Sequence, residues 1–460
     1  MSHYQDFLST KRVTTEAAGF DIAISDINPQ LFGWQRRIVQ WAIRRGRAAL
    51  FEGTGLGKTG QQLEWARIVA DYTALPVLIL APLAVAKQTQ REGAKFGIPV
   101  TVCRSQSDVR SGVNVANYEM LGHFDPDTFG GIVLDESSIL KAFSGVARKE
   151  LTVFAKGIPY RLCCTATPAP NDLIELTNHA EFLDVMSGKE ILALFFTQDG
   201  NTTHAWRLKG HAVDPFYRWL ASWAVALRSP ADLGDDDDRF ILPPLTMHQI
   251  EVESDAVQSG MLFPVEALTL QERQRERRAT VESRVAATAA LVNASADPWI
   301  VWCGLNDESV AVTKAIPGAV EVTGSDTPEY KERAMLDFAD GTIRVLVSKT
   351  SICGFGMNWQ HCSNVVFVGL SDSWEQYYQA IRRCWRFGQT KEVNAYIVTA
   401  DTEGAVVRNI ERKEKQAAGM MASLVHHMAG LHVAFSSSRD EMEYAPSEPM
   451  RLPWWMENAA

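Results

Sequence analysis

A glycine-rich loop near the start of the chain constrains the fold more than any other feature. Its residues are Glu52-Gly53-Thr54-Gly55-Leu56-Gly57-Lys58-Thr59. The loop follows the apolar run Ala48–Phe51 and precedes a helical pattern from Lys58 to Asp71. Its three glycines permit a tight turn whose amides point at phosphate oxygens, and the helix start adds the positive end of its dipole. A strand, loop and helix in this order predict a nucleotide site in a parallel α/β domain.

The individual residues of the loop suit a nucleoside triphosphate with a magnesium ion. The ammonium group of Lys58 is expected to contact the outer phosphates, and the hydroxyl of Thr59 is expected to bind the metal. Thr54 and Leu56 lie between the glycines and complete the predicted phosphate cradle. Glu52 stands where the strict pattern has glycine, but the GxGKT core is intact. The predicted cofactors are therefore ATP and Mg²⁺.

An acidic pair follows a second apolar strand. Asp135 and Glu136 come directly after Ile132–Leu134. Ligands of an open parallel sheet bind beyond the carboxyl ends of its strands, so this pair is expected to lie beside the glycine loop. Asp135 is predicted to hold magnesium, usually through water, and Glu136 to orient or deprotonate the attacking water.

A basic patch more than three hundred residues later offers the complementary charge. Its residues are Gln379-Ala380-Ile381-Arg382-Arg383-Cys384-Trp385-Arg386. Arg383 and Arg386 are three residues apart in a helical pattern that starts near Trp374, which predicts that they share a face. Arginine at the γ-phosphate neutralises the charge that develops in phosphoryl transfer. The two arginines reach such a site only if a second domain folds over the first.

Length and strand pattern predict two such domains. A chain of 460 residues exceeds what one hydrophobic core usually supports. We expect an α/β fold with two tandem RecA-like parallel-sheet domains, a helical insertion and a short C-terminal tail. The expected segments are an N-terminal segment 1–30, an ATP-binding domain 31–185, an aromatic-rich helical appendage 186–240, a connecting strand and long helix 241–297, a second domain 298–410, and a helical and irregular tail 411–460.

Composition excludes several classes of protein. With 46% apolar and 22% charged residues, the chain has no stretch of the length that spans a membrane, and its start lacks the features of a signal peptide. We expect a cytoplasmic protein of a bacterium or of a phage-infected host. The seven cysteines form no CxxC pair, which predicts free thiols rather than a zinc site. The net charge of -10 leaves room for only a local basic groove.

The motifs and their order make the chain resemble a superfamily 2 helicase of the DEAD/DEAH-box type, in the Swi/Snf-like branch of double-stranded DNA translocases and in the compact form found in phages and prophages. The resemblance covers residues 31–410. The matching segments are Leu31–Gln35, Leu80–Leu83, Asn117–Glu119, Asp135–Ser138, Thr165–Asn171, Val322–Ser325, Cys353–Asn358 and Gln379–Gln389. Departures from the family pattern are Ser137-Ser138 after the acidic pair, Cys353 for a glycine, and Arg382 for a glycine.

The resemblance implies roles for further residues. Gln35 resembles the glutamine that reads adenine, and Gly356 lies in a motif implied to contact the nucleotide. The arginine roles fall on Arg383 and Arg386. Residues implied to contact nucleic acid or to couple hydrolysis to movement are Pro82, Lys87, Thr165, Thr167, Thr323, Ser348, Thr350 and Gln379.

We therefore expect an ATP-dependent motor that moves along duplex DNA without sequence preference. Two alternatives remain open at this point. One is an RNA-dependent or strand-separating helicase built on the same core. The other is a nucleotide-gated adaptor that recruits a protein partner through the aromatic appendage or the tail.

Overall fold

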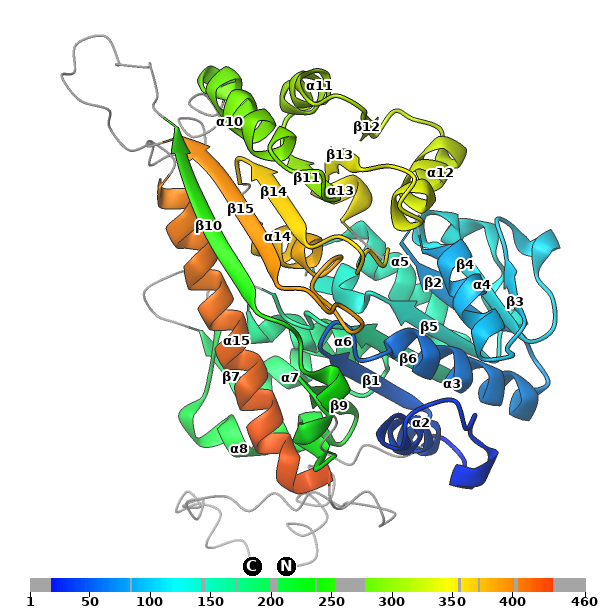
Figure 1. Cartoon of the computed structure of the whole chain (residues 1–460). Coiled ribbons are helices and arrows are strands. Elements are labelled where there is room, and N and C mark those ends of the chain that lie inside the picture. The colour runs from blue at the N-terminus through cyan, green and yellow to red at the C-terminus, as the bar shows by residue number, and fades with distance from the viewer. Residues whose placement is uncertain are drawn as a thin grey trace, which may run out of the picture.

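The computed structural model describes residues 18–82, 85–141, 145–170, 172–198, 206–235, 238–252, 278–354, 357–370, 373–400 and 404–432. Gly356, most of the expected N-terminal segment and the end of the expected tail lie outside these residues. Figure 1 shows two α/β lobes, the first in blue to green and the second in green to orange.

Each lobe is built on its own parallel sheet. The first has the order β3-β4-β2-β5-β6-β1-β9, and the second has the order β10-β15-β14-β11-β13-β12. The strands of the first are β1 (Arg47–Glu52), β2 (Val77–Ala81), β3 (Val100–Val102), β4 (Val113–Asn117), β5 (Gly131–Asp135), β6 (Tyr160–Thr165) and β9 (Ala224–Leu227). Those of the second are β10 (Leu245–Val252), β11 (Trp299–Cys303), β12 (Ala319–Val322), β13 (Val345–Lys349), β14 (Asn364–Val368) and β15 (Val393–Ala400). The predicted fold of two tandem parallel-sheet domains is confirmed.

Helices cover both faces of each sheet, which is the arrangement that parallel strands require. Those of the first lobe are α2 (Gly33–Arg45), α3 (Lys58–Thr73), α4 (Ala86–Lys95), α5 (Val146–Phe154), α6 (Leu176–Phe182), α7 (Gly188–Phe195) and α8 (Val213–Ala221). The later helices are α10 (Val281–Asn293), α11 (Asn306–Ala315), α12 (Pro328–Ala339), α13 (Thr350–Cys353), α14 (Trp374–Ile381) and α15 (Gly404–His432). None of the helices in the described ranges is long and apolar enough to cross a membrane.

Alternation along the strands divides the first lobe's core into two layers. Ala49 and Phe51 of β1 pack on one face with α6, α7 and α8, whereas Ala48 and Leu50 pack on the other with α2 and α3. Successive side chains of a strand point to opposite faces, so a strand covered on both sides is apolar throughout. This explains why β1 and β6 are continuous buried runs rather than alternating ones.

The aromatic segment expected as an appendage packs as a layer of the first lobe. Phe216, Trp219 and Trp223 are buried in the same core as Phe51. Strand β9 pairs in parallel with β1 at the edge of the first sheet. The antiparallel hairpin β7 (Phe196–Gln198) and β8 (Trp206–Leu208) lies in the same segment. The segment thus completes the sheet that carries the glycine loop.

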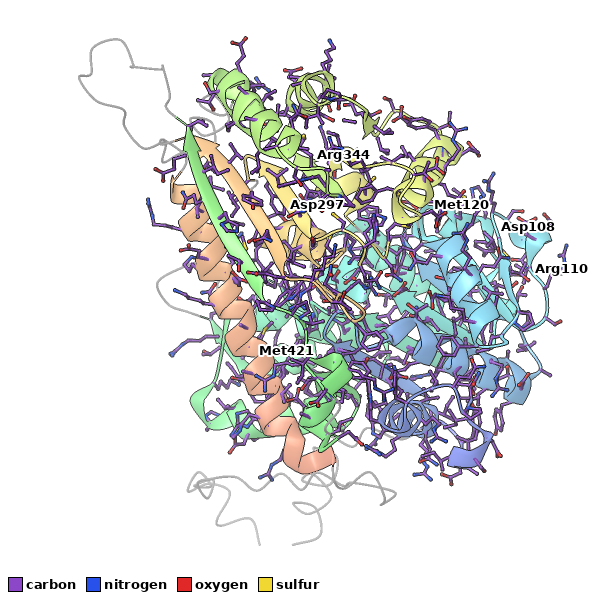
Figure 2. All side chains as sticks on the ribbon, viewed as in Figure 1. Asp108, Arg110, Met120, Asp297, Arg344 and Met421 are labelled. Atoms are coloured by element: carbon purple, nitrogen blue, oxygen red, sulfur yellow. The ribbon has the colours of Figure 1, made fainter. Side chains whose placement is uncertain are left out.

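Helix α15 runs from the second lobe back onto the first (Figure 1). Val406 and Ile410 near its start are buried in the second lobe's core. Leu424 and Val425, about four turns later, are buried in the first lobe's core, and Met421 packs beside them (Figure 2). The same helix therefore contacts the cores of both lobes.

Candidate nucleotide site between the two lobes

The glycine loop joins the end of β1 to the start of α3. Gly55 and Gly57 have φ angles of 91° and 76°, in the left-handed region that favours glycine. The ammonium of Lys58 lies in the loop, where its Nζ donates to the carbonyls of Glu52 at 2.7 Å and Gly53 at 3.1 Å. Carbonyl oxygens are weaker partners than phosphate for a full positive charge. The loop is thus formed, with its lysine held by groups that an anion can replace.

Gln35 ties the start of α2 to this loop. Its Nε2 donates to the carbonyl of Leu56 at 2.8 Å, and its Oε1 accepts from the amide of Phe32 at 3.0 Å. A Cβ atom at Gly57 would lie 2.5 Å from Nε2 of the Gln35 side chain, so a substitution there would displace this side chain from the loop. The structure therefore places the predicted adenine-reading residue against the loop.

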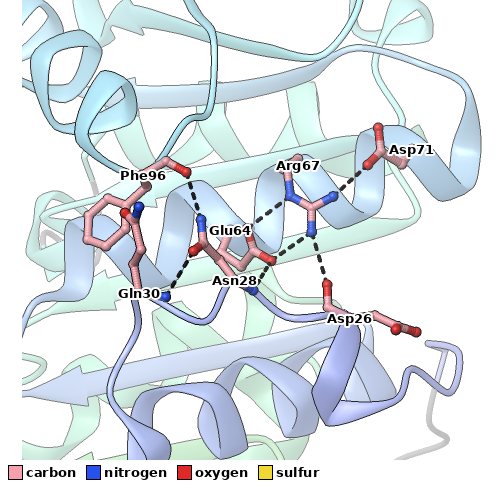
Figure 3. Close-up of polar contacts among 7 residues, drawn as sticks. All are labelled: Asp26, Asn28, Gln30, Glu64, Arg67, Asp71 and Phe96. Atoms are coloured by element: carbon pink, nitrogen blue, oxygen red, sulfur yellow. Dashed lines mark hydrogen bonds and ion pairs between the residues drawn. The ribbon is translucent and has the colours of Figure 1, made fainter.

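A polar network fixes the segment that leads into α2 (Figure 3). The amide of Asn28 donates to Glu64 of α3 at 2.9 Å, and its Nδ2 donates to the carbonyl of Phe96 at 2.7 Å. Arg67 donates to both oxygens of Glu64, at 2.7 and 2.9 Å. The segment before Gln35 is thereby attached to the helix that follows the glycine loop.

The acidic pair lies at the end of β5, beside the loop. Glu136 has a φ of 61°, unusual for a residue with a side chain, and its carboxylate accepts from Ser138 Oγ at 3.1 Å and Thr165 Oγ1 at 2.5 Å. The amide of Thr167 donates to the same Thr165 hydroxyl at 3.0 Å. Burial, with the negative charge of Glu136, raises the pKa of Asp135 to about 6. Thr165 and Thr167 thus link the end of β6 to Glu136.

Both predicted arginines reach this site from the second lobe. A cavity of about 90 Å³ is lined by Thr54, Gly55, Gly57, Lys58, Thr59, Pro82, Val85, Gln88, Thr89, Asp135, Glu136, Asn358, Arg383 and Arg386. Arg383 is held there by Gln379, which accepts through its carbonyl at 2.9 Å and through Oε1 at 2.8 Å. Gln379 therefore orients Arg383 within its own lobe.

The helical prediction for the arginine pair needs a correction. Helix α14 ends at Ile381, and the residues after it form turns, although the backbone amide of Trp385 still donates to the carbonyl of Ile381 at 3.0 Å in the i to i−4 pattern of a helix. Arg383 and Arg386 thus do not share a face of one continuous helix. They nevertheless line the same cavity, and the Nη1 of each donates to the carbonyl of Met357 at 3.4 Å.

The charges of the cavity suit a bound anion. Burial, with the positive charge of Arg383, lowers the pKa of Arg386 to about 9. The buried Nε of Arg386 and the buried hydroxyl of Thr54 lack hydrogen-bond partners in the described structure. A triphosphate offers acceptors to these donors and to Lys58. Thr59 and Asp135 supply oxygen ligands, and magnesium is commonly held by few protein oxygens together with phosphates. The residues present fit both predicted cofactors.

Sequence reasoning missed several groups of this cavity. Gln88 and Thr89, from the first turn of α4, line it, as does Asn358 of the second lobe, which lies in the matching segment Cys353–Asn358 but was assigned no role of its own. Outside the cavity lining but beside Gly55, Phe387 stacks on Phe240 with ring centroids 4.7 Å apart. The local sequence around Gln88 does not predict that it lines the nucleotide cavity, because only the folded chain brings α4 to the end of β1.

A second and larger cavity separates the lobes on the side of α12. It has a volume of about 700 Å³, and its lining includes the predicted nucleic-acid residues Pro82 and Lys87. Met120 of the first lobe faces it opposite α12 (Figure 2). Pro82 and Glu136 line this cavity and the nucleotide cavity alike. The two cavities therefore share a wall.

The other predicted nucleic-acid contacts are engaged within the second lobe. Ser348 is buried and donates to the carbonyl of Val322 at 2.8 Å. Thr350 donates to Gln376 Oε1 at 3.2 Å, and the Thr323 hydroxyl lies 3.0 Å from that of Ser325. Ser351 and Ile352, next to Thr350, line the larger cavity.

The chain has similarities to known proteins. Residues 300–388 match the helicase conserved C-terminal domain. The chain is 24% identical over 457 residues to protein p41 of Acyrthosiphon pisum secondary endosymbiont phage 1, covering 84% of this chain and 96% of that protein. It is also similar to the Sulfolobus solfataricus SWI2/SNF2 ATPase core in complex with dsDNA, at 16% identity and a TM-score of 0.42, covering 90% of this chain and 96% of that chain.

Fold and site together define a two-lobed α/β protein with a glycine-rich loop in one lobe and arginines from the other beside it. The second lobe contains the matched helicase domain. This match bears out the helicase resemblance over residues 300–388, and one similar protein comes from a phage.

Proposed function

We propose that the protein is an ATP-driven motor that moves along double-stranded DNA, as in the Swi/Snf-like branch. The observation that carries this proposal is the nucleotide cavity lined from both lobes. The loop with Lys58 belongs to the first lobe, whereas Arg383 and Arg386 belong to the second. Hydrolysis then depends on how the lobes meet, which is the property a motor needs.

In the proposed reaction, ATP lies with its adenine near Gln35 and its phosphates on the glycine loop. Lys58 stabilises the outer phosphates, and Glu136 receives a proton from the attacking water. Magnesium, held by Thr59 and Asp135, would neutralise phosphate charge. Arg383 and Arg386 stabilise the charge that develops on the transferred γ-phosphoryl group. The chain thus offers a group for each need of phosphoryl transfer.

Polymer binding is assigned to the larger cavity between the lobes. Pro82, Lys87 and Lys141 line it, together with residues of α12. Pro82 and Glu136 belong to the wall shared with the nucleotide cavity, so a polymer that shifts this wall also shifts the group proposed to activate water. The proposal couples movement to hydrolysis through this shared wall.

Steady-state ATP turnover against duplex DNA, single-stranded DNA and RNA tests the proposal. Duplex DNA of unrelated sequences is expected to raise turnover to a similar degree. Preferential stimulation by RNA or single strands would instead favour the alternative helicase. Slow turnover that no nucleic acid changes, with a protein partner captured only in ATP, would favour the adaptor and overturn the motor.

A further inference from the structure

Ion pairs join the two lobes along the larger cavity, and they differ in burial. Arg104 and Glu329, 3.8 Å apart, have side chains that are 77% and 71% exposed. Lys87 and Glu332 are 59% and 25% exposed. Lys141 and Glu375 are 40% and 8% exposed. Exposed ion pairs contribute little free energy because water screens them. The Lys141–Glu375 pair is therefore expected to matter most.

The positions of these two residues connect the halves of the nucleotide site. Lys141 ends the short 3-10 helix Ser137–Lys141, which begins directly after Glu136. Glu375 lies in the first turn of α14, and the chain reaches Arg383 two residues after that helix ends. The pair thus joins the segment that follows Glu136 in the sequence to the helix that precedes the two arginines in the sequence.

Docking the arginines over the glycine loop has an electrostatic cost. Burial lowers the pKa of Arg383 and Arg386, which means that the cavity disfavours their charged forms. The attraction between Lys141 and Glu375 acts between the lobes and outside the nucleotide cavity. It offsets part of this cost before a phosphate group is present. The carboxylate of Glu375 also lies at the N-terminus of α14, where the helix dipole favours negative charge. Glu375 can therefore pair with Lys141 while its own helix remains stabilised.

We propose that Lys141 and Glu375 are a positioning pair, which holds α14 against the acidic segment so that Arg383 and Arg386 face the phosphates. This inference rests on the proposed ATPase function for its catalytic consequence. Its structural content, that the pair sets the distance between the lobes, is independent of turnover. Neither residue is proposed to touch the nucleotide.

Charge reversal in the full chain tests the pair. Lys141→Glu and Glu375→Lys are each expected to lower kcat at least tenfold, with ATP affinity within about twofold of the starting protein. The double variant restores the attraction with opposite signs and is expected to recover most of kcat. The Arg44→Asp, Asp21→Arg and double variants form the matched control, since they reverse an exposed ion pair within the first lobe that lines neither cavity.

An activity-independent readout uses spin labels on cysteines introduced at the exposed positions Lys156 in the first lobe and Lys314 in the second. The seven native cysteines are free and buried, so labelling is directed to the new sites. The single reversals are expected to lengthen or broaden the interlobe distance, and the double reversal to restore it.

Single reversals that leave both distance and kcat unchanged would overturn the proposal. So would a folded double variant as defective as either single variant. If a reversed chain fails to fold, Lys141→Gln and Glu375→Gln give the same test with a smaller change. Absence of turnover in the starting protein would defeat the proposed function, whereas the distance measurement would still decide whether the pair sets the lobe positions.

Discussion

Gly55 of the first lobe lies directly against Phe387 of the second. A Cβ atom on Gly55 would be 2.7 Å from the backbone nitrogen of Phe387, closer than real side chains approach. The Phe387 ring in turn stacks on the Phe240 ring. The ring centroids of Phe387 and Phe32 lie 6.3 Å apart. The glycine turn proposed to bind phosphate is therefore also a point where the two lobes meet.

Substitution of Gly55 should consequently disturb the lobe contact. Gly55→Ala adds the clash with Phe387 and the strain of a φ of 91°, so nucleic-acid-stimulated ATP turnover is expected to fall at least tenfold. Gly112→Ala is the matched control, because Gly112 has a φ of 87° with open space around its Cβ position. Equal turnover in the two variants would show that the contact is unimportant.

Substitutions of Lys58 and Glu136 should affect nucleotide binding and ATP hydrolysis differently. Lys58→Ala removes the only loop ammonium and is expected to weaken ATP binding and abolish turnover. Glu136→Gln keeps the shape of the side chain but removes its basicity, which should lower turnover by about 10² to 10⁴ while ATP still binds. Fluorescent-nucleotide titration beside steady-state turnover checks both. A Glu136→Gln protein with normal turnover would remove Glu136 from its proposed role.

Arg386 should contribute to the transition state rather than to nucleotide binding. Arg386→Ala is expected to retain ATP binding and to lose stimulated hydrolysis by about 10³ or more, as for other arginines at a γ-phosphate. Arg386→Lys keeps a charge without the planar fork and should recover only part of the rate. Normal stimulated turnover in Arg386→Ala would refute this role.

Glu52 should make stability depend on pH. Burial raises its pKa to about 7 from 4.5 in spite of Lys58 and Gln61. Between pH 4.5 and pH 7 the native state then binds more protons than the unfolded state. The stability that the protonated Glu52 carboxyl contributes is therefore fully present below about pH 4.5 and is lost as the pH rises through 7. Glu52→Gln stays neutral and should gain up to about 3 kcal/mol over the starting protein at pH 8, with little gain near pH 4.5.

Thermal and urea unfolding of Glu52→Gln at both pH values measures this difference. The exposed Glu150→Gln on α5 serves as the control for loss of one negative charge. A Glu52→Gln gain that is the same at both pH values would contradict the assignment.

Leu424 should show whether α15 docks on the first lobe. Its side chain is fully buried in that core, so Leu424→Ala is expected to destabilise the protein by about 2 to 5 kcal/mol. Gly419→Ala on the same helix faces open space and should be neutral or stabilising. Chemical denaturation of both variants provides the measurement. A Leu424→Ala protein as stable as Gly419→Ala would mean that the helix does not dock there.

Local sequence predicted the elements whose signals are local. The helix expected over Lys58–Asp71 is observed as Lys58–Thr73, since the glycine turn starts it and it is then buried on nearly all sides from Gly60 to Ala70. Strand β9 was not predicted, because Ala224–Leu227 becomes a strand by pairing with β1, which lies far earlier in the chain. The expected long helix before residue 293 is described from Val281, and its earlier part lies outside the described residues.

The amino-acid sequence by itself determined which chemical groups are present: a glycine-rich loop with a lysine, an acidic pair at a strand end and two late arginines. Only the tertiary structure decided that these groups face one cavity, that turns rather than a helix present the arginines, and that Lys141 and Glu375 join the lobes. Motif spacing reports backbone geometry over a few residues. The meeting of two lobes depends instead on packing and charge between segments hundreds of residues apart, which no local pattern encodes.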